Sequence, residues 1–289
     1  MGAHSDMWNP RTLTWSSLVT RMGWERKLAP LRSAFDVLGP VRPALAERLG
    51  LRPDVAVLCG IHDSGASLLP YLKTREAPFA VVSTGTWVIL FAVGSALENL
   101  DPARDTLANV SAYGDLVACA RFMGGREFEL MTNGETAPAS EADLSRVLTD
   151  KIMALPTFVA GAGPFATGSG GWTTDPDRLT AGERNAAASL YVALVTAESL
   201  NAAGASGPVV VEGPFAENAV FLGALAAITG ARVEPAEAGA GTTLGATLIA
   251  TGKMPARRAK PVAQAPLAHA ALAGYAAAWR ESARQTRWR

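Results

Sequence analysis

The last third of the chain alternates short apolar runs with helical segments, and this alternation restricts the fold more than any other feature. Residues 209–211 predict a strand, residues 217–229 a helix, residues 232–233 a short strand and residues 242–250 another helix. This order is typical of an α/β sheet covered by helices. We therefore predict an α/β fold for this part of the chain.

Strands are also predicted earlier. Residues 79–83 and 87–93 read as two strands joined by a tight turn, and residues 116–122 as a third. The run 55–60 predicts a buried strand that ends in glycine and leads to a helix over residues 66–72.

Capping residues and composition define several helices and one loop. Five glycines in residues 161–171 indicate a loop, and Ser140 with Asp143 fits an N-cap. Further helices are expected over residues 43–49, 126–129, 140–150, 180–203 and 267–284. Gly50 directly follows the first of these, and the helix over residues 180–203 is expected to be long and amphipathic.

Composition indicates a globular protein without a strongly charged partner. Apolar residues make up 49% and charged residues 18% of the 289 residues, and 26 Lys and Arg balance 26 Asp and Glu. We therefore expect neither nucleic acid nor a membrane as a partner. Cys59 and Cys119 are expected to be buried free thiols, and no signal segment is recognisable, which together favour a reducing, cytoplasmic location.

Residues 60–65 contain the first candidate for chemistry. His62 and Asp63 follow a predicted strand and precede a helix, the position where open α/β sheets bind ligands. A carboxylate there can accept the proton of an attacking hydroxyl. It can equally cap the following helix. The residues themselves leave both interpretations open.

Two further loops offer groups suited to a nucleotide. Residues 83–87 combine three hydroxyls with a glycine in a turn that can hold a phosphate, although an ordinary hairpin turn has the same pattern. Residues 212–218 lie between a strand and a helix and can border a nucleotide, although routine βα connections look alike. Residues 239–245 lack the spacing of a dinucleotide fingerprint.

In the order of these loops, the chain resembles the FGGY carbohydrate kinases along almost its whole length. Residues 60–65 resemble the family's catalytic-aspartate loop and residues 83–87 its second phosphate loop. Residues 209–218 resemble its adenosine loop, and residues 238–250 the glycine- and alanine-rich helix that follows. The resemblance implies an actin- and hexokinase-like (ribonuclease H-like) fold, with residues 1–70 as a remnant of the sugar-binding domain and residues 71–289 as the C-terminal nucleotide-binding domain.

The resemblance also implies roles for individual residues. Asp63 would be the general base and His62 a sugar contact, as in the rhamnulose- and fuculose-kinase branch; a neutral histidine oriented by a backbone carbonyl is the alternative for His62. The nucleotide contacts would be Thr84, Gly85 and Thr86 at the phosphates and Gly213 and Asn218 at the adenosine. ATP and Mg²⁺ would be the cofactors, and no metal-binding residue is assigned.

Two departures from the family pattern qualify this resemblance. Nothing in residues 1–50 matches the Asp-Gly-Thr motif that opens the family's first domain, which implies that the start of that domain is missing here. Pro214 and Phe215 replace residues that are glycine in many members, and a bulky ring there can reshape or block the base pocket.

These patterns favour an ATP-dependent kinase for a ketose or polyol, truncated and weakly active or inactive alone. One alternative is a non-catalytic remnant that binds a nucleotide or a protein partner and conceals its exposed interface by forming a homo-oligomer. Another is one half of a split kinase that a separately encoded N-terminal half completes.

Overall fold

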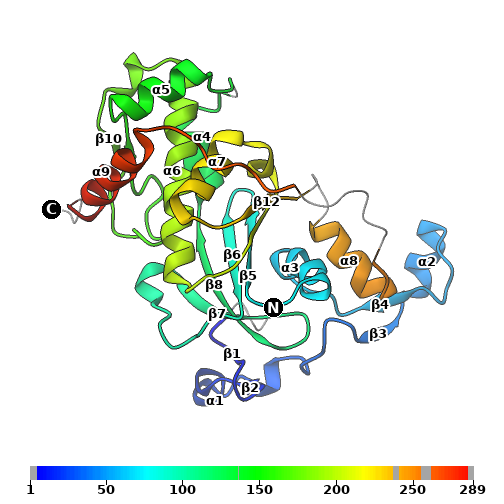
Figure 1. Ribbon diagram of the computed structural model, residues 1–289. Helices are drawn as coiled ribbons and strands as arrows, with labels where there is room; N and C mark the ends of the chain where they lie inside the picture. The colour runs from blue at the N-terminus through cyan, green and yellow to red at the C-terminus, as the bar shows by residue number, and fades with distance from the viewer. Residues whose placement is uncertain (1–4, 136, 237–240, 255–261, 286–289) are drawn as a thin grey trace. The chain divides into compact units, whose positions relative to one another are not determined.

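The computed structural model describes residues 5–135, 137–236, 241–254 and 262–285 (Figure 1). The chain forms two compact units. Unit 1 contains the described parts of residues 1–75, 109–116 and 240–258, and unit 2 those of residues 76–108, 117–239 and 259–289.

Unit 2 is built on a six-stranded mixed sheet. β11 runs parallel to β12 and β5, whereas β6 is antiparallel to β5 and β8. The strands predicted for this part of the chain are present, which confirms the α/β prediction; β7 was not predicted. Across the sheet the order is β12 (Val233–Pro235), β11 (Val209–Glu212), β5 (Phe79–Thr84), β6 (Val88–Val93), β8 (Leu116–Phe122) and β7 (Thr106–Val110).

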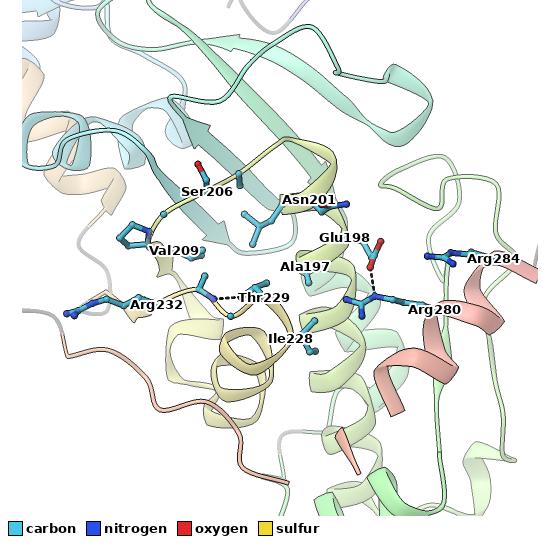
Figure 2. A pocket seen from close by; sticks show the side chains of 16 residues that line it. Ala197, Glu198, Asn201, Ser206, Val209, Ile228, Thr229, Arg232, Arg280 and Arg284 are labelled. Atoms are coloured by element: carbon cyan, nitrogen blue, oxygen red, sulfur yellow. Dashed lines mark hydrogen bonds and ion pairs between the residues drawn. The ribbon is translucent and has the colours of Figure 1, made fainter. Parts of the chain in front are cut away.

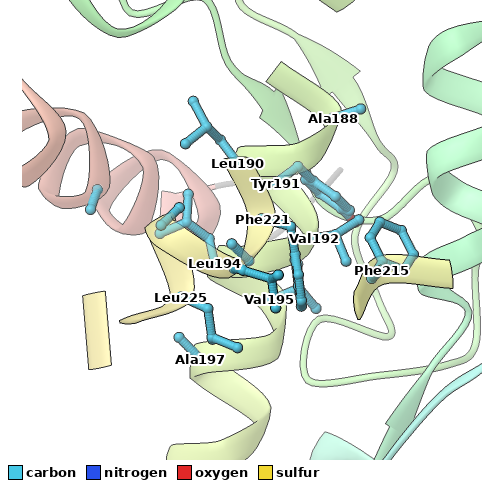
Figure 3. Packing of buried hydrophobic residues seen from close by; sticks show 14 of the residues in the cluster. Ala188, Leu190, Tyr191, Val192, Leu194, Val195, Ala197, Phe215, Phe221 and Leu225 are labelled. Atoms are coloured by element: carbon cyan, nitrogen blue, oxygen red, sulfur yellow. The ribbon is translucent and has the colours of Figure 1, made fainter. Parts of the chain in front are cut away.

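Helix α6 (Ala181–Ala202) packs against α4, α5, α7 and strand β6 of unit 2. Thr180 and Glu183 form the capping box that starts it. The prediction of an amphipathic helix was wrong, because every side chain of residues 186–197 is buried. A helix that is apolar on all sides belongs inside a core. Figure 3 shows side chains of α6, such as Tyr191, close to Phe215 and Phe221, which follow β11 in the chain.

The other helices of unit 2 agree closely with prediction. The predicted N-cap of α5 is confirmed, since Ser140 Oγ accepts from Asp143 N at 3.1 Å. The last helix begins at Leu272 rather than at residue 267, and its buried Trp279 donates to the carbonyl of Ala154 at 2.7 Å. The remaining elements of unit 2 are α4 (Gly124–Thr132), α5 (Glu141–Thr149), α7 (Ala219–Thr229), α9 (Leu272–Gln285), the strands β9 (Ala154–Leu155) and β10 (Gly171–Trp172), and the 3₁₀ turns η3 (Pro102–Arg104), η4 (Pro176–Arg178) and η5 (Pro214–Glu217).

In unit 1, helices α3 (Asp63–Thr74) and α8 (Gly241–Thr251) pack against each other. A Cβ on Gly245 would overlap the carbonyl oxygen of Ala66, so glycine allows this close approach. Residues 238–240, the start of the predicted glycine- and alanine-rich helix, lie outside the described residues. Unit 1 further contains α2 (Pro43–Leu49), which is as predicted, β1 (Trp8–Asn9), β2 (Thr14–Trp15), α1 (Ser17–Met22), η2 (Glu25–Lys27), β3 (Val37–Pro40) and β4 (Ala56–Leu58).

The strand predicted over residues 55–60 is shorter and more exposed than expected. β4 pairs antiparallel with β3 in a two-stranded sheet, and Val57 is 43% exposed. Cys59 is exposed as well, so the expectation of a buried thiol is wrong there, whereas Cys119 in β8 is buried as expected. An apolar run indicates a strand, but it does not show whether a second layer covers that strand. Within the part of the chain that the structure describes, no helix combines the length and apolar character needed to cross a membrane.

Candidate nucleotide and substrate sites

The turn after β5 and the loop after β11 meet at one edge of the unit 2 sheet. The two strands are parallel neighbours, so their carboxyl ends lie together. The buried Thr84 hydroxyl joins the loops by donating to the carbonyl of Glu212 and accepting from Phe215 N at 3.2 Å. Gly213 has φ +78°, and a Cβ there would overlap the carbonyl oxygen of Thr84. Sequence reasoning grouped these residues, but it did not foresee that Thr84 links the two loops.

Helix α4 brings a third element to the same place. A Cβ on Gly125 would overlap the carbonyl oxygen of Gly85, and Arg126 N donates to the carbonyl of Thr86 at 3.3 Å. The start of α4 therefore rests directly on the predicted phosphate turn. From the sequence, the glycine pair 124–125 indicated only the beginning of a helix.

These three elements border a cavity of about 300 Å³, which we call the nucleotide cavity after the contacts that the sequence predicts there. Phe215 is only 6% exposed and packs edge-on against Phe128, with ring centroids 5.2 Å apart. Its ring therefore belongs to the core and forms a wall of the cavity. The lining residues are Gly85, Thr86, Gly125, Arg126, Phe128, Glu129, Pro214, Phe215 and Asn218.

Asn218 borders the nucleotide cavity and also holds its loop in place. Its Oδ1 accepts from Phe221 N at 2.9 Å as the N-cap of α7, and its Nδ2 donates to Ser189 Oγ on α6 at 2.9 Å. Arg126 and Glu129, which sequence reasoning missed, form an ion pair of 2.7 Å between half-exposed side chains.

The buried carboxylate of Glu127 connects α4 to other parts of unit 2 through hydrogen bonds. Glu127 is 2% exposed and accepts hydrogen bonds from Phe158 N at 3.0 Å, Val159 N at 3.2 Å and the Tyr191 hydroxyl at 3.0 Å. Burial raises the pKa of Glu127, and these bonds only partly oppose that shift. Burial and the charge of Glu127 in turn raise the pKa of Tyr191 well above its ordinary value.

In unit 1, His62 and Asp63 lie at the start of α3. His62 is the N-cap and Asp63 the first helical residue, so the helix begins three residues earlier than predicted. The His62 Nδ1 atom lies 2.7 Å from Asp63 Oδ1, and Asp63 Oδ1 also accepts from Ser64 N at 2.6 Å. The Asp63 side chain is 74% exposed, so its carboxylate is accessible rather than enclosed in a salt bridge.

His62 also lines a cavity of about 580 Å³ within unit 1. Trp8, Phe35 and Tyr113 contribute to its walls, and the last two rings stack with centroids 5.6 Å apart. Aromatic walls with a few polar groups are typical of small-molecule sites.

The described residues do not provide a protein-held metal site. No group of three or more His, Cys, Asp or Glu side chains among them is placed to hold a metal ion. The described residues therefore do not fit a metal held by the protein alone.

Comparisons with known proteins identify the family of this chain. The family profile "Carbohydrate kinase FGGY, C-terminal domain" matches residues 76–260. A carbohydrate kinase from Novosphingobium aromaticivorans is 37% identical, with a TM-score of 0.82 over 97% of this chain and 64% of that one. No curated protein sequence matches the chain.

Two more distant structures show the same fold. A ligand-bound xylulose kinase from Lactobacillus acidophilus has a TM-score of 0.72 at 14% identity, covering 97% of this chain and 61% of that one. Plasmodium falciparum glycerol kinase, solved with ADP, has a TM-score of 0.67 at 11% identity, covering 98% of this chain and 62% of that one. The chain thus spans less than two thirds of each of these structures, and the actin- and hexokinase-like fold prediction is confirmed. The match over residues 76–260 places this chain in the FGGY carbohydrate kinase family.

Proposed function

We propose that this chain takes part in phosphoryl transfer from ATP to a hydroxyl of a ketose or polyol. The observation that supports this most is the nucleotide cavity, where the turn after β5, the loop after β11 and the start of α4 meet. Family membership and the likeness to a carbohydrate kinase at 37% identity support the same activity.

Different parts of the nucleotide cavity suit the base and the phosphates of a nucleotide. Phe128, Pro214 and Phe215 offer an apolar wall to a base. Thr86 offers a backbone N–H group and a hydroxyl to the phosphates, whereas the N–H of Gly85 already donates to the carbonyl of Trp87 at 2.9 Å. Thr84 is buried and already bonded to the neighbouring loop, so we propose that it holds the turn, while Thr86 makes the phosphate contact.

Asp63 is proposed as the general base, with His62 beside it as a substrate contact. The acceptor hydroxyl would give its proton to the Asp63 carboxylate as its oxygen bonds to the γ-phosphorus. The bond from that phosphorus to the β–γ bridging oxygen would break, releasing ADP. The exposed carboxylate supports this role, and the cavity lined by His62, Phe35 and Tyr113 is the proposed sugar pocket.

Other parts of the prediction rest on the sequence alone. Use of Mg²⁺ with the nucleotide, a cytoplasmic location and membership of the rhamnulose- and fuculose-kinase branch stay predictions. We expect any Mg²⁺ to be held largely by the nucleotide phosphates, because no group of three or more His, Cys, Asp or Glu side chains among the described residues is placed to hold one.

A partner-binding role is the second candidate, and the β3–β4 sheet favours it. Val37, Leu38 and Val57 are 62%, 56% and 43% exposed. A two-stranded sheet with such side chains gains stability when another surface covers it. Light scattering over a range of concentrations, combined with nucleotide titration, separates the two functions: oligomers without nucleotide binding would favour the partner-binding role.

The kinase proposal is tested by titrating the chain with Mg-ATP and repeating the titration with two variants. Thr86→Ala should weaken nucleotide binding roughly tenfold, because it removes a bond to a charged phosphate. Asp63→Asn should leave nucleotide affinity within about twofold, because the base acts on the acceptor hydroxyl. The proposed assignments fail if Asp63→Asn weakens ATP binding while Thr86→Ala does not.

Two controls accompany these variants. Thr149→Ala changes an exposed threonine at the end of α5, and Asp177→Asn an exposed aspartate in η4. Neither should alter ATP binding. If sugar phosphorylation is measurable, Asp63→Asn should lower kcat by at least about a hundredfold.

A further inference from the structure

A second cavity of unit 2 lies away from the nucleotide cavity, at the opposite end of strand β11 (Figure 2). Its volume is about 810 Å³, and it is bordered by the last turn of α6, the segment 205–209, the end of α7 and the helix α9. It shares no lining residue with the nucleotide cavity. We call it the α6–α9 cavity.

The α9 side of this cavity carries an excess of positive charge. Glu198 Oε1 on α6 accepts from Arg280 Nε at 2.7 Å, and both side chains are largely buried, at 18% and 34% exposure. Arg284 extends from α9 toward this pair (Figure 2). The cavity lining at α9 therefore holds two guanidinium groups beside one carboxylate. Among the residues that the structure describes, Arg284 has no recorded ion pair and the recorded bond of Arg280 uses Nε alone.

The rest of the lining is uncharged apart from Arg232, whose Nε is paired with Glu234 at 2.7 Å. Leu200, Val209 and Ile228 supply apolar surface, and Asn201 and Ser206 supply an amide and a hydroxyl. No hydrogen bond from either polar side chain is recorded within the described part of the chain. A ligand with one anionic end and a small hydroxylated body would therefore match both sides of the cavity.

We propose that the α6–α9 cavity binds a small organophosphate, a phosphate ester on a hydroxylated body about the size of a pentose. A phosphate offers three acceptor oxygens, enough for the terminal nitrogens of Arg280 and for Arg284, whereas a carboxylate offers two. Cavities of this volume accommodate ligands of this size.

The α6–α9 cavity and the nucleotide cavity lie at opposite ends of strand β11. Val209 at the start of β11 lines the α6–α9 cavity, and Glu212 at its end leads into the nucleotide loop. Val209 and Glu212 are three residues apart in an extended strand, so their Cα atoms are separated by about 10 Å. Both ligands can therefore be bound at the same time, and binding here does not depend on the kinase proposal.

The test is calorimetric titration of the full chain with ribose 5-phosphate, in parallel with ribose, inorganic phosphate and ribonate. We expect saturable binding of ribose 5-phosphate at least about tenfold tighter than that of the other three. Arg284→Gln should weaken it roughly tenfold, because it removes a charged hydrogen-bond donor. Arg178→Gln, which changes an arginine with 82% exposure elsewhere in unit 2, should leave it unchanged.

Three outcomes would overturn the proposal: no saturable binding, equal binding of ribonate or inorganic phosphate, or equal affinity in the Arg284→Gln variant. Binding at the kinase active site is distinguished by two further measurements. Saturating ADP should not displace the organophosphate, and Thr86→Ala should not weaken its binding; displacement by ADP together with insensitivity to Arg284→Gln would assign the ligand to the nucleotide cavity instead. The far-UV circular dichroism spectrum of Arg284→Gln should match that of the wild type, which shows that the variant is folded.

Discussion

Replacing Glu127 by alanine should destabilise unit 2 more than any exposed change on α4. The carboxylate accepts from two backbone N–H groups, those of Phe158 and Val159, and from the Tyr191 hydroxyl. Alanine would leave these three donors without their acceptor. Each unsatisfied buried donor costs about 1–3 kcal/mol. Because the two backbone groups are only half-buried and water can reach them, we expect a total of about 2–5 kcal/mol.

Glutamine at position 127 should cost much less than alanine. Its amide oxygen can accept from both backbone N–H groups, and its NH₂ group can donate to the Tyr191 oxygen, so only the Tyr191 hydroxyl loses its acceptor. This one lost acceptor, together with weaker neutral hydrogen bonds, leaves a loss of about 1–2 kcal/mol. Glu129→Ala is the matched control, since that side chain is 57% exposed on the same helix, and it should change stability by less than about 0.5 kcal/mol.

The raised pKa of Glu127 adds a pH signature to this comparison. Burial lifts the folded-state pKa above the ordinary value of 4.5, so the folded protein keeps a proton that the unfolded chain has released. The stability from this group is therefore fully present below pH 4.5 and is lost as the pH rises through the raised folded pKa. Glu127→Gln cannot titrate, so its stability relative to the wild type should improve with rising pH across that window.

Urea unfolding followed by far-UV circular dichroism and tryptophan fluorescence measures these differences. Coincident transitions in the two signals are needed for a free energy of unfolding. The reasoning would be refuted if Glu127→Ala lay within about 1 kcal/mol of the wild type, or if alanine and glutamine destabilised equally.

Three further changes test other parts of the structure. Gly213→Ala should lower the free energy of unfolding by at least about 2 kcal/mol, because alanine at φ +78° is strained and its Cβ would overlap the Thr84 carbonyl; a cost below 1 kcal/mol would contradict the close approach. Asn218→Ala should cost about 1–2 kcal/mol in urea unfolding through loss of the α7 cap, and an unchanged midpoint would rule out that role. A colorimetric thiol reagent should modify one cysteine of the folded chain quickly, and Cys59→Ser should remove that phase; two fast thiols would show that Cys119 is accessible.

Local signals in the sequence were enough for several elements. Pro43 at the start and Gly50 beyond the end defined α2, and the Ser140–Asp143 capping box defined the start of α5. These signals succeed because a cap is satisfied by residues three or four positions away. Five strands of the six-stranded sheet were equally recognisable, because strands buried on both faces are nearly continuous apolar runs, whereas the partly buried β7 was missed.

What covers an element could not be predicted in the same way. The apolar pattern of α6 did not reveal that other elements surround it, and that of β4 did not reveal that Val57 stays exposed. The sequence did not distinguish Glu127 from other polar residues of its short helix, because its three hydrogen-bond partners lie 31 to 64 positions away in the sequence. Its hydrogen bonds depend on the fold, so no local spacing indicates them.

The two proposed halves of the kinase reaction belong to different units, and this makes them experimentally separable. The nucleotide cavity is formed entirely by unit 2 residues, on loops that Thr84 joins and α4 supports. Asp63 belongs to unit 1, on the helix that packs against α8. Nucleotide affinity should therefore follow changes around Thr86 and be insensitive to Asp63, whereas phosphoryl transfer requires both groups. A chain that binds ATP but phosphorylates no sugar would be consistent with the nucleotide cavity and with the weak activity expected from the sequence, so only a measurable transfer rate that Asp63→Asn leaves unchanged would refute the proposed role of Asp63.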